Sequence, residues 1–240
     1  MDGVLVIDKP EGITSHDVVS RVKRRLGARK VGHLGTLDPI ATGVLVLVID
    51  GATKHAEALQ GGHKGYEATV RLGQATDSYD REGVVTSEAD VTGLTEAKVK
   101  EALDGFLGSQ MQTPPMFSAV KKNGVPLYKL AREGKVVERA PKEIEVFSIE
   151  MTAFELPLVK FTVVASRGTY IRSICHDLGE RLGVGAHLVE LRRTLSGEFS
   201  IEQAVSSELS RSELMEAILP LKEVIADKAQ KTSEIDGASG

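Results

Sequence analysis

The stretch GHLGTLDPIATG, residues 32–43, contains a single carboxylate, Asp38, between Leu37 and Pro39. An Asp-Pro pair commonly does no more than start a turn. The neighbouring side chains are apolar, however, and the three glycines of the stretch let a backbone approach a ligand closely. A carboxylate in such surroundings has a raised pKa unless a cation holds it charged. From these residues alone, Asp38 is either a turn residue or a reactive carboxylate.

The segment RGTYIRSICHDLGERLG, residues 167–183, offers a cation for that carboxylate. Its pattern predicts a helix capped by Thr169, with Tyr170 and Arg172 in the first turn. The buried stripe of this helix would consist of Ile171, Ile174, Cys175, Leu178 and Leu182. Because Arg172 lies off that stripe and gains little from the helix dipole there, it favours an anionic partner. Arg172 is therefore the candidate counter-ion of Asp38, and an ordinary surface arginine is the alternative.

Five further side chains have types that take part in catalysis elsewhere. Tyr66 opens the alternating pattern YEATVRLG, and its local interpretation is a half-buried aromatic that packs across strands. His16 and His33 are interpreted as hydrogen-bonded structural histidines. Asp77 and Asp80 in TDSYDREG do not have the spacing of a calcium loop, so a solvated turn is expected there.

The apolar periodicity predicts interleaved strands and helices. Strands are expected over GVLVID, GVLVLVID, YEATVRLG and KFTVVAS. One helix is expected between the capping box Thr14/Asp17 and the stop signal Gly27, with its basic residues facing solvent, and another after Thr95. A last amphipathic helix is expected over SRSELMEAILPLKEVI. The predicted fold class is mixed α/β, with residues about 110–142 as an excursion from a single domain.

The composition argues against disulfide-bonded, metal-dependent, membrane-spanning and exported proteins. One cysteine, Cys175, in 240 residues excludes an internal disulfide and a multi-cysteine metal site. Because there is no HExxH pair, no apolar run near ~18 residues and no export signal, we expect a cytoplasmic protein without metal or membrane anchor. The net charge is −4, but basic residues cluster at 21–30 and 121–142, and acidic residues gather towards the C-terminus. This distribution leaves basic surface for a phosphate backbone.

Five segments carry a family resemblance: VLVIDKPEGITSHDVV, KVGHLGTLDPIATGVL, YEATVRLGQATDSYDREG, TPPMFSAVKKNGVPLYKLAREGKVVERAPKEI and SRGTYIRSICHDLGERLGVGAHLVELRRTLSGEF. Together they resemble the TruB family of tRNA pseudouridine synthases over about residues 3–200. The motifs GTLDP and GTYIRS are diagnostic of that family. The resemblance implies an α+β fold, the pseudouridine synthase fold, whose central and largely antiparallel mixed sheet is flanked by helices and loops around a cleft.

The resemblance implies an isomerase that needs no metal or cofactor. Asp38 would be its essential carboxylate, and Arg172 would pair with that carboxylate. Tyr66 would stack on the target base and is a proposed proton acceptor. The implied substrate is tRNA, bound through its T arm, with the T-loop uridine at tRNA position 55 as the target. A non-catalytic module that binds or folds RNA through the same cleft is the alternative, and a small-molecule hydrolase is a distant third.

The resemblance also implies residues that bind the substrate. Tyr170 and Leu191 would form pocket walls, His33 would pack against displaced nucleotides, and Lys9 would have a supporting structural role. The expected phosphate contacts of the insertion 110–142 are Lys129, Arg132 and Arg139.

The expected organisation is a catalytic domain over residues 1–215, acting as a monomer. Residues 216–240 are expected to contain a helix end and an acidic, disordered tail, without the PUA-type RNA-binding extension that many bacterial relatives carry. An expected departure from the family is Leu34, where threonine is common, with an effect on local packing.

Overall fold

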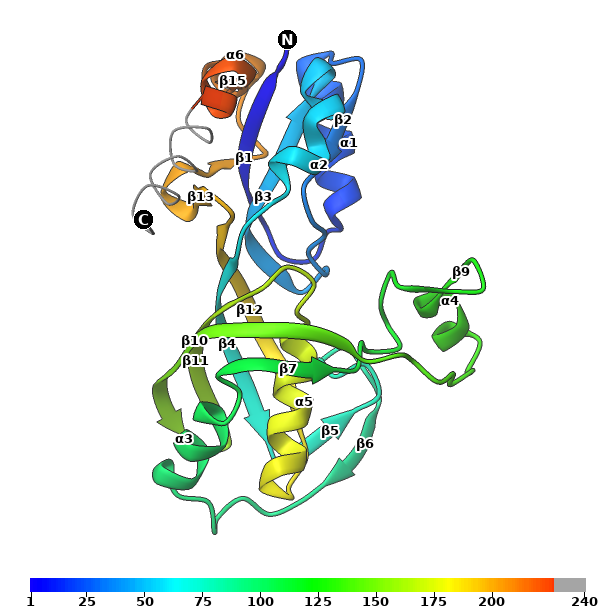
Figure 1. Cartoon of the computed structure of the whole chain (residues 1–240), viewed down its shortest axis with the longest axis vertical. Coiled ribbons are helices and arrows are strands. Elements are labelled where there is room, and N and C mark those ends of the chain that lie inside the picture. The colour runs from blue at the N-terminus through cyan, green and yellow to red at the C-terminus, as the bar shows by residue number, and fades with distance from the viewer. Residues whose placement is uncertain (227–240) are drawn as a thin grey trace, which may run out of the picture. The chain divides into compact units, whose positions relative to one another are not determined.

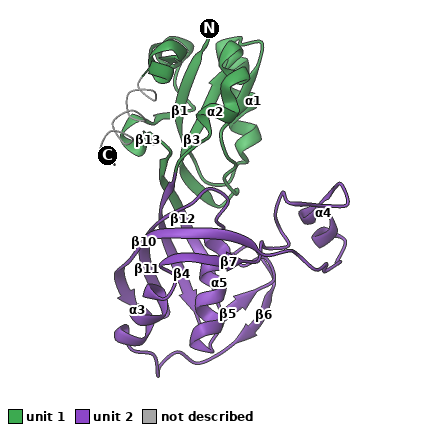
Figure 2. Cartoon of the chain, viewed as in Figure 1, with its two compact units in different colours: residues 1–62, 192–240 green, residues 63–191 purple. Residues whose placement is uncertain are grey.

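The computed structural model describes residues 1–226, which form two compact units (Figure 2). The first unit joins Met1–Gly62 to the segment that begins at Arg192, and the second unit is His63–Leu191. Strand β12 (Ala186–Ser196) carries the chain from the second unit back into the first. The range 1–215, which the sequence predicts as one catalytic domain, therefore draws on both units.

The first unit is built on β1 (Gly3–Lys9), which pairs antiparallel with β3 (Ala41–Ile49). The short strand β2 (Val31–His33) pairs antiparallel with β3, and β14 (Val205–Ser206) pairs parallel with β1. The other elements of the unit are α1 (Ser15–Leu26), the 3-10 helix η1 (Asp50–His55), α2 (Ala56–Leu59), β13 (Phe199–Ser200), the 3-10 helix η2 (Ile201–Gln203), α6 (Arg211–Glu216) and β15 (Leu219–Pro220) (Figure 1).

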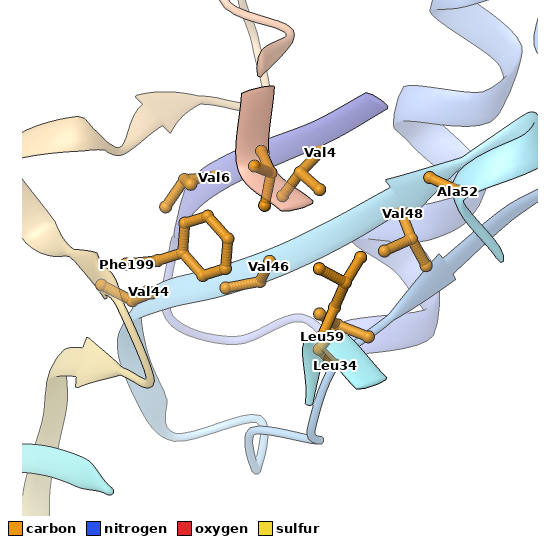
Figure 3. Close-up of a cluster of buried hydrophobic side chains, with 10 residues drawn as sticks. Val4, Val6, Leu34, Val44, Val46, Val48, Ala52, Leu59 and Phe199 are labelled. Carbon is orange, nitrogen blue, oxygen red and sulfur yellow. The ribbon is translucent and has the colours of Figure 1, made fainter. Parts of the chain in front are cut away.

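Apolar side chains from β1, β3 and their neighbours form the core of the first unit (Figure 3). Both faces of β3 are buried, as its uninterrupted apolar sequence predicts. Each fully buried aliphatic side chain contributes about 1.5–3 kcal/mol to burial free energy. The cluster on one face consists of Val4, Val6, Leu34, Val44, Val46, Val48, Ala52, Leu59, Phe199 and Val224. Leu34, the expected departure from the family, is thus a core residue.

Helix α1 has the termini that its sequence predicts. The Asp17 N–H donates to Thr14 Oγ1 at 3.1 Å, and the Thr14 N–H donates to the Asp17 carboxylate at 2.9 Å, which completes the capping box. Gly27 ends the helix at φ +68°, a left-handed conformation that glycine adopts without steric cost.

The basic face of α1 is only partly open to solvent, so the expectation that all its cations face solvent is wrong. Arg25 donates to the carbonyls of Ser207 and Leu209, both at 2.9 Å. Arg21 and Arg25 also form ion pairs with Glu208. Two cations of the cluster are thus engaged within their own unit. The exposed members are Lys23, Arg24, Arg29 and Lys30.

The second unit contains a sheet in the order β12-β4-β11-β10-β7, with helices α3 and α5. The pairs β4·β11, β11·β10 and β10·β7 are antiparallel. The sheet strands are β4 (Lys64–Leu72), β7 (Gly108–Gln112), β10 (Lys142–Glu155) and β11 (Leu158–Ala165). The remaining elements are β5 (Gln74–Thr76), β6 (Val85–Glu88), α3 (Glu96–Asp104), β8 (Lys121–Lys122), β9 (Val125–Pro126), α4 (Leu127–Arg132) and α5 (Ile171–Leu182).

Helix α5 begins one residue later than its sequence predicts. Its N-cap is Tyr170, without a side-chain capping bond, so Thr169 is not the cap. Arg172 is buried, with 3% of its surface exposed, whereas Leu182 is partly exposed. The helix packs closely on its neighbour, because a Cβ on Gly179 would lie 2.2 Å from a backbone nitrogen of β12.

The predicted last helix is divided in two. α6 ends at Glu216, and β15 (Leu219–Pro220) then pairs with β1, before residues 221–226 return to helix. Pro220 explains the break, because proline has no N–H for a helix interior. The expected disordered tail lies, from residue 227 onwards, outside the described residues. No helix within residues 1–226 has the length and apolar character needed to cross a membrane.

Candidate active site

The loop that carries Asp38 connects β2 to β3 in the first unit. Asp38 is half-buried, and its main-chain carbonyl accepts a hydrogen bond from the Ala41 N–H at 3.0 Å. The flanking side chains of Leu34, Leu37 and Ile40 are each no more than 4% exposed. The apolar setting that the sequence predicts for Asp38 is therefore confirmed.

Lys9 holds the C-terminal side of this loop. Its side chain is fully buried, and Nζ donates to the carbonyls of Pro10 at 2.9 Å, Pro39 at 3.3 Å and Ala41 at 2.7 Å. Burial lowers the pKa of Lys9 to about 8, and the negative charge of Asp38 opposes that shift. The ammonium thus places its three N–H groups on three carbonyls, two of which follow the carboxylate in the chain.

Arg193 holds the N-terminal side of the same loop. It is 1% exposed, and its guanidinium donates to the carbonyls of Gly35 at 3.1 Å, Thr36 at 3.4 Å and Val44 at 2.7 Å. The sequence reasoning missed this residue. The available signal was the pair of adjacent arginines in the pattern LRR. Successive side chains of a strand point to opposite faces of the sheet, so these two arginines must lie on different faces.

Ser15 fixes the residue that precedes Asp38. The serine is buried, its Oγ donates to the Leu37 carbonyl at 3.1 Å, and it accepts from the Leu37 N–H at 2.9 Å. We call Lys9, Ser15 and Arg193 the loop clamp. Together they engage the carbonyls of five of the seven residues 35–41. These hydrogen bonds restrict the movement of the loop backbone, so the side chain of Asp38 projects from a fixed main chain.

His33 ends β2, just before this loop. Its Nδ1 is buried without a hydrogen-bond partner among the described residues, so the expected hydrogen-bonded histidine is not seen at that atom. Burial and then the charges of Arg193 and His16 lower the pKa of His33. The lowered pKa favours the neutral form of the ring.

Arg172 is the centre of the polar network in the second unit. Its Nη1 donates to the Ser78 carbonyl at 3.0 Å and lies 3.6 Å from Asp80 Oδ2, and its Nη2 donates to the Phe117 carbonyl at 2.8 Å. The interpretation of Arg172 as a surface arginine is therefore wrong. Its predicted pairing with Asp38 stays a prediction, because the two residues belong to different units.

Asp80 is not the solvated turn residue that its sequence predicts. It is 6% exposed and accepts hydrogen bonds from Ser78 Oγ at 2.7 Å and from the Glu82 N–H at 3.0 Å. A buried carboxylate is costly unless it is paired and hydrogen-bonded, and Arg172 supplies the opposite charge. Asp77, in contrast, is exposed as expected.

Three predicted site residues lie in the second unit: Tyr66 in β4, Tyr170 at the N-cap of α5 and Leu191 in β12. Tyr66 lies in β4, opposite Val163 of β11, and is buried instead of half-buried as its local pattern predicts. Leu191 is buried in β12. Tyr170 is half-buried, and its backbone N–H and carbonyl both bond to the side-chain amide of Gln112, at 2.8 Å and 3.1 Å. The Gln112 amide therefore fixes the start of α5, and with it Arg172.

Two family profiles match this sequence over most of its length. The profile described as TruB family pseudouridylate synthase (N terminal domain) matches residues 23–171, and that of the tRNA pseudouridylate synthase B C-terminal domain matches residues 172–226. The chain belongs to the TruB family.

Curated TruB-family relatives are similar along nearly the whole chain. The tRNA pseudouridine synthase B of Opitutus terrae is 50% identical over 93% of this chain and 90% of its own length. That of Geobacter sulfurreducens is 53% identical over 90% of this chain and 71% of its own length.

Solved structures confirm the pseudouridine synthase fold. A chain of a Cbf5-Nop10-Gar1 complex is 33% identical, with a TM-score of 0.71 over 92% of this chain. A chain of an H/ACA RNP bound to a substrate RNA containing 2′-deoxyuridine is 34% identical, with a TM-score of 0.64 over 85% of this chain. This TruB-family chain spans 61% and 50% of the length of those two solved chains.

The basic insertion of this TruB-family chain contains β8, β9 and α4, which Figure 1 draws as a small lobe between the ends of β7 and β10. Lys129 and Arg132 of α4 are exposed, and the Arg132 guanidinium lies 5.5 Å from the ring centroid of Tyr128. Arg139 is half-buried and donates to the Pro114 carbonyl at 3.1 Å. A pocket of about 800 Å³ is lined by Pro114, Val120, Lys121, Lys122, Leu127, Glu138, Arg139, Ala140, Pro141 and Lys142.

Proposed function

We propose that this chain is a tRNA pseudouridine synthase that converts the T-loop uridine at tRNA position 55 to pseudouridine. Membership of the TruB family and relatives named tRNA pseudouridine synthase B support the reaction and the class of substrate. The observation that carries the proposal is the loop clamp, because three buried polar side chains are committed to the backbone around one carboxylate. Fixed placement of a reacting group is a main source of enzymatic rate.

The proposed reaction requires an ionised carboxylate with an opposite charge beside it, and Asp38 and Arg172 take these roles. Isomerisation breaks the N1–C1′ bond, turns the detached base and forms a C5–C1′ bond. N1 gains a proton and C5 loses one, so no electrons are exchanged with a cofactor. Asp38 either attacks the base or the sugar, or stabilises charge at C1′, and in each case it must be ionised in a dry site. Arg172 supplies the opposite charge in this proposal.

The target uridine must leave its stack before it can react. Extrusion of a base costs a few kcal/mol, and aromatic side chains offset part of that cost by stacking. Tyr66 takes this role for the target base, and the neutral ring of His33 packs against nucleotides that are displaced with it. Tyr170 and Leu191 form walls of the pocket.

The insertion 110–142 grips the T arm of the RNA through phosphate contacts. The exposed side chains of α4 and the basic lining of the pocket support this assignment. Each phosphate contact adds about −0.7 to −0.9 to the slope of log K against log salt. Substitution of Lys129, Arg132 and Arg139 by alanine should flatten that slope, with turnover at saturating RNA nearly unchanged. Substitution of the exposed Arg71, Lys98 and Lys160 of the same unit is the matched control.

We further propose that residues 1–215 form the catalytic domain and that the protein acts as a monomer in the cytoplasm. The T arm is the proposed recognition element, so an isolated T-arm hairpin should be a substrate. A hairpin that is not converted, beside whole tRNA that is, would show that recognition extends beyond the T arm.

The deciding experiment incubates the full chain with unmodified tRNA and maps pseudouridine by position. Asp38→Asn should abolish turnover and leave the tRNA affinity within about threefold, because phosphate contacts dominate binding. Asp90→Asn, which alters an exposed carboxylate of the second unit, is the control and should retain full activity. Tight binding of tRNA without product would instead identify a non-catalytic RNA-binding module.

A further inference from the structure

Tyr79 has a backbone conformation that its residue type rarely adopts. Its φ is +67°, in the left-handed region. The other non-glycine residues with positive φ among residues 1–226 are Asp50 and Asn123, whose short polar side chains tolerate that region. A bulky aromatic residue there is strained and persists only where its surroundings hold it.

Tyr79 lies between two residues that both contact the guanidinium of Arg172. Ser78 precedes it, and the Ser78 carbonyl accepts from Arg172 Nη1 at 3.0 Å. Asp80 follows it, and the Asp80 carboxylate lies 3.6 Å from the same nitrogen. The reversal of the backbone at Tyr79 therefore lets a main-chain carbonyl and the next side-chain carboxylate meet the same guanidinium.

The ring of Tyr79 is held by the helix that carries Arg172. It stacks on His176 with a centroid separation of 3.8 Å and an interplanar angle of 7°. His176 follows Arg172 by four residues, so both side chains project from one side of α5. The His176 Nδ1 is buried without a hydrogen-bond partner in the described part of the chain. Among the described residues, the contact of this imidazole with Tyr79 is therefore made by its ring face and not through a hydrogen bond of Nδ1.

Backbone bonds fix the other side of the turn. The Tyr79 carbonyl accepts from the Leu188 N–H at 3.0 Å, and the Arg81 N–H donates to the Leu188 carbonyl at 2.9 Å. The turn is consequently held between β12 on one side and the helix on the other. On the helical side, the turn is held by the ring contact and by its contacts with Arg172.

We propose that Tyr79 and His176 are positioning residues of the reaction, whose stacked rings hold the 78–80 turn so that Ser78 and Asp80 fix the Arg172 guanidinium. This inference rests on the proposed function, in which Arg172 acts on the catalytic carboxylate. The two rings do not touch the substrate in this scheme. They set the orientation of a group that acts in the reaction.

The test compares four variants in the full chain. Tyr79→Phe keeps the ring and should leave the single-turnover rate on unmodified tRNA unchanged. Tyr79→Gly relaxes the backbone strain but removes the ring, and should lower that rate by about 100-fold with tRNA affinity unchanged, because small misplacement of a reacting group has this effect. His176→Ala should lower the rate similarly, and His176→Phe should restore it.

The control is the other ring pair of the second unit, His63 and Phe147, whose centroids lie 4.4 Å apart. Phe147→Leu should leave the rate unchanged. A purely structural role for the Tyr79–His176 stack predicts a lower Tm for Tyr79→Gly and His176→Ala, with a normal rate well below that temperature. That result would overturn the inference.

NMR of isotope-labelled arginine side chains gives a readout that does not need turnover. Arg172→Lys identifies the Arg172 signals, which should broaden or shift in Tyr79→Gly and His176→Ala and stay in place in Tyr79→Phe. Unchanged Arg172 signals in folded Tyr79→Gly would refute the positioning role, whatever the activity. A wild-type chain that forms no pseudouridine, but whose Arg172 signals respond as expected, would refute the proposed function and leave the geometry confirmed.

Discussion

Ser15→Ala tests the loop clamp with the smallest change that the structure offers. The substitution removes one oxygen atom and with it two hydrogen bonds, at 3.1 Å and 2.9 Å, to the carbonyl and N–H of Leu37. Both atoms are then buried without that partner, next to Asp38. An ordinary hydrogen bond contributes about 1 kcal/mol net, and a buried group left unsatisfied costs about 1–3 kcal/mol. We therefore expect a loss of about 2–4 kcal/mol, taken either from global stability or from the order of the loop.

Three measurements separate these outcomes. Urea denaturation gives the change in the free energy of unfolding, hydrogen exchange gives the protection of the Leu37 amide, and single-turnover kinetics give the rate of pseudouridine formation. Loosening of the loop should raise amide exchange at Leu37 and lower the rate by at least about tenfold, which corresponds to 1.4 kcal/mol at the transition state. The matched control is Ser207→Ala, because Ser207 is also buried in the first unit and its hydroxyl accepts from Arg21 instead of bonding to the loop.

The reasoning about the clamp has a clear point of failure. If Ser15→Ala changes the stability by less than about 0.5 kcal/mol, as a neutral surface substitution does, and leaves exchange and rate as in the control, the Ser15 contacts do not hold the catalytic loop.

Three further predictions concern packing and charge. Gly179→Ala should destabilise the protein by about 3 kcal/mol or more in urea denaturation, because the new Cβ meets backbone atoms that cannot move aside, while Gly93→Ala, with open space around it, should have no effect. Asp80→Asn should lower the single-turnover rate by at least about tenfold without loss of tRNA affinity, because Arg172 loses a buried counter-charge; an unchanged rate would contradict the assigned role of Asp80. The pKa of Lys9, lowered by burial to about 8, predicts that the rate falls as the pH rises through that value, because the neutral amine has one N–H fewer for three carbonyls. The effect of Lys9 on stability has the opposite direction. Between about pH 8 and 10.5, the pKa of this group in the unfolded chain, the unfolded chain binds more protons, so the free energy of unfolding rises with pH. A rate of pseudouridine formation that is independent of pH up to about 9 would contradict the assigned role of Lys9.

The secondary structure was predictable at several positions where a local rule applies, although the predicted cap at Thr169 is wrong. The capping box of Thr14 and Asp17, the left-handed Gly27 and the apolar run of β3 act over a few residues, and all three are confirmed. The errors arose where distant segments intervened. The last helix is divided at β15, because pairing with β1 and the missing N–H of Pro220 outweigh the helical periodicity.

The candidate site was predictable to a smaller extent. The apolar surroundings of Asp38 follow from its neighbours in the chain, and the family resemblance selected Arg172 and Tyr66. Asp80 was misassigned as a solvated turn residue, because its partner Arg172 follows 92 residues later and no local pattern connects the two. Ser15 was passed over for a similar reason.

The sequence by itself determined the termini of α1, the apolar run of β3, and that one carboxylate lies in an apolar, glycine-containing loop. These properties depend on side-chain type and on spacings of two to four residues. Only the tertiary structure decided that Arg193 and Lys9 hold the two ends of that loop, and that the turn at Tyr79 presents Ser78 and Asp80 to Arg172. The physical reason is that a buried hydrogen bond depends on which segments the fold places within about 3 Å of each other, and a polar side chain has the same local signature whether its partner is water or a carbonyl far along the chain.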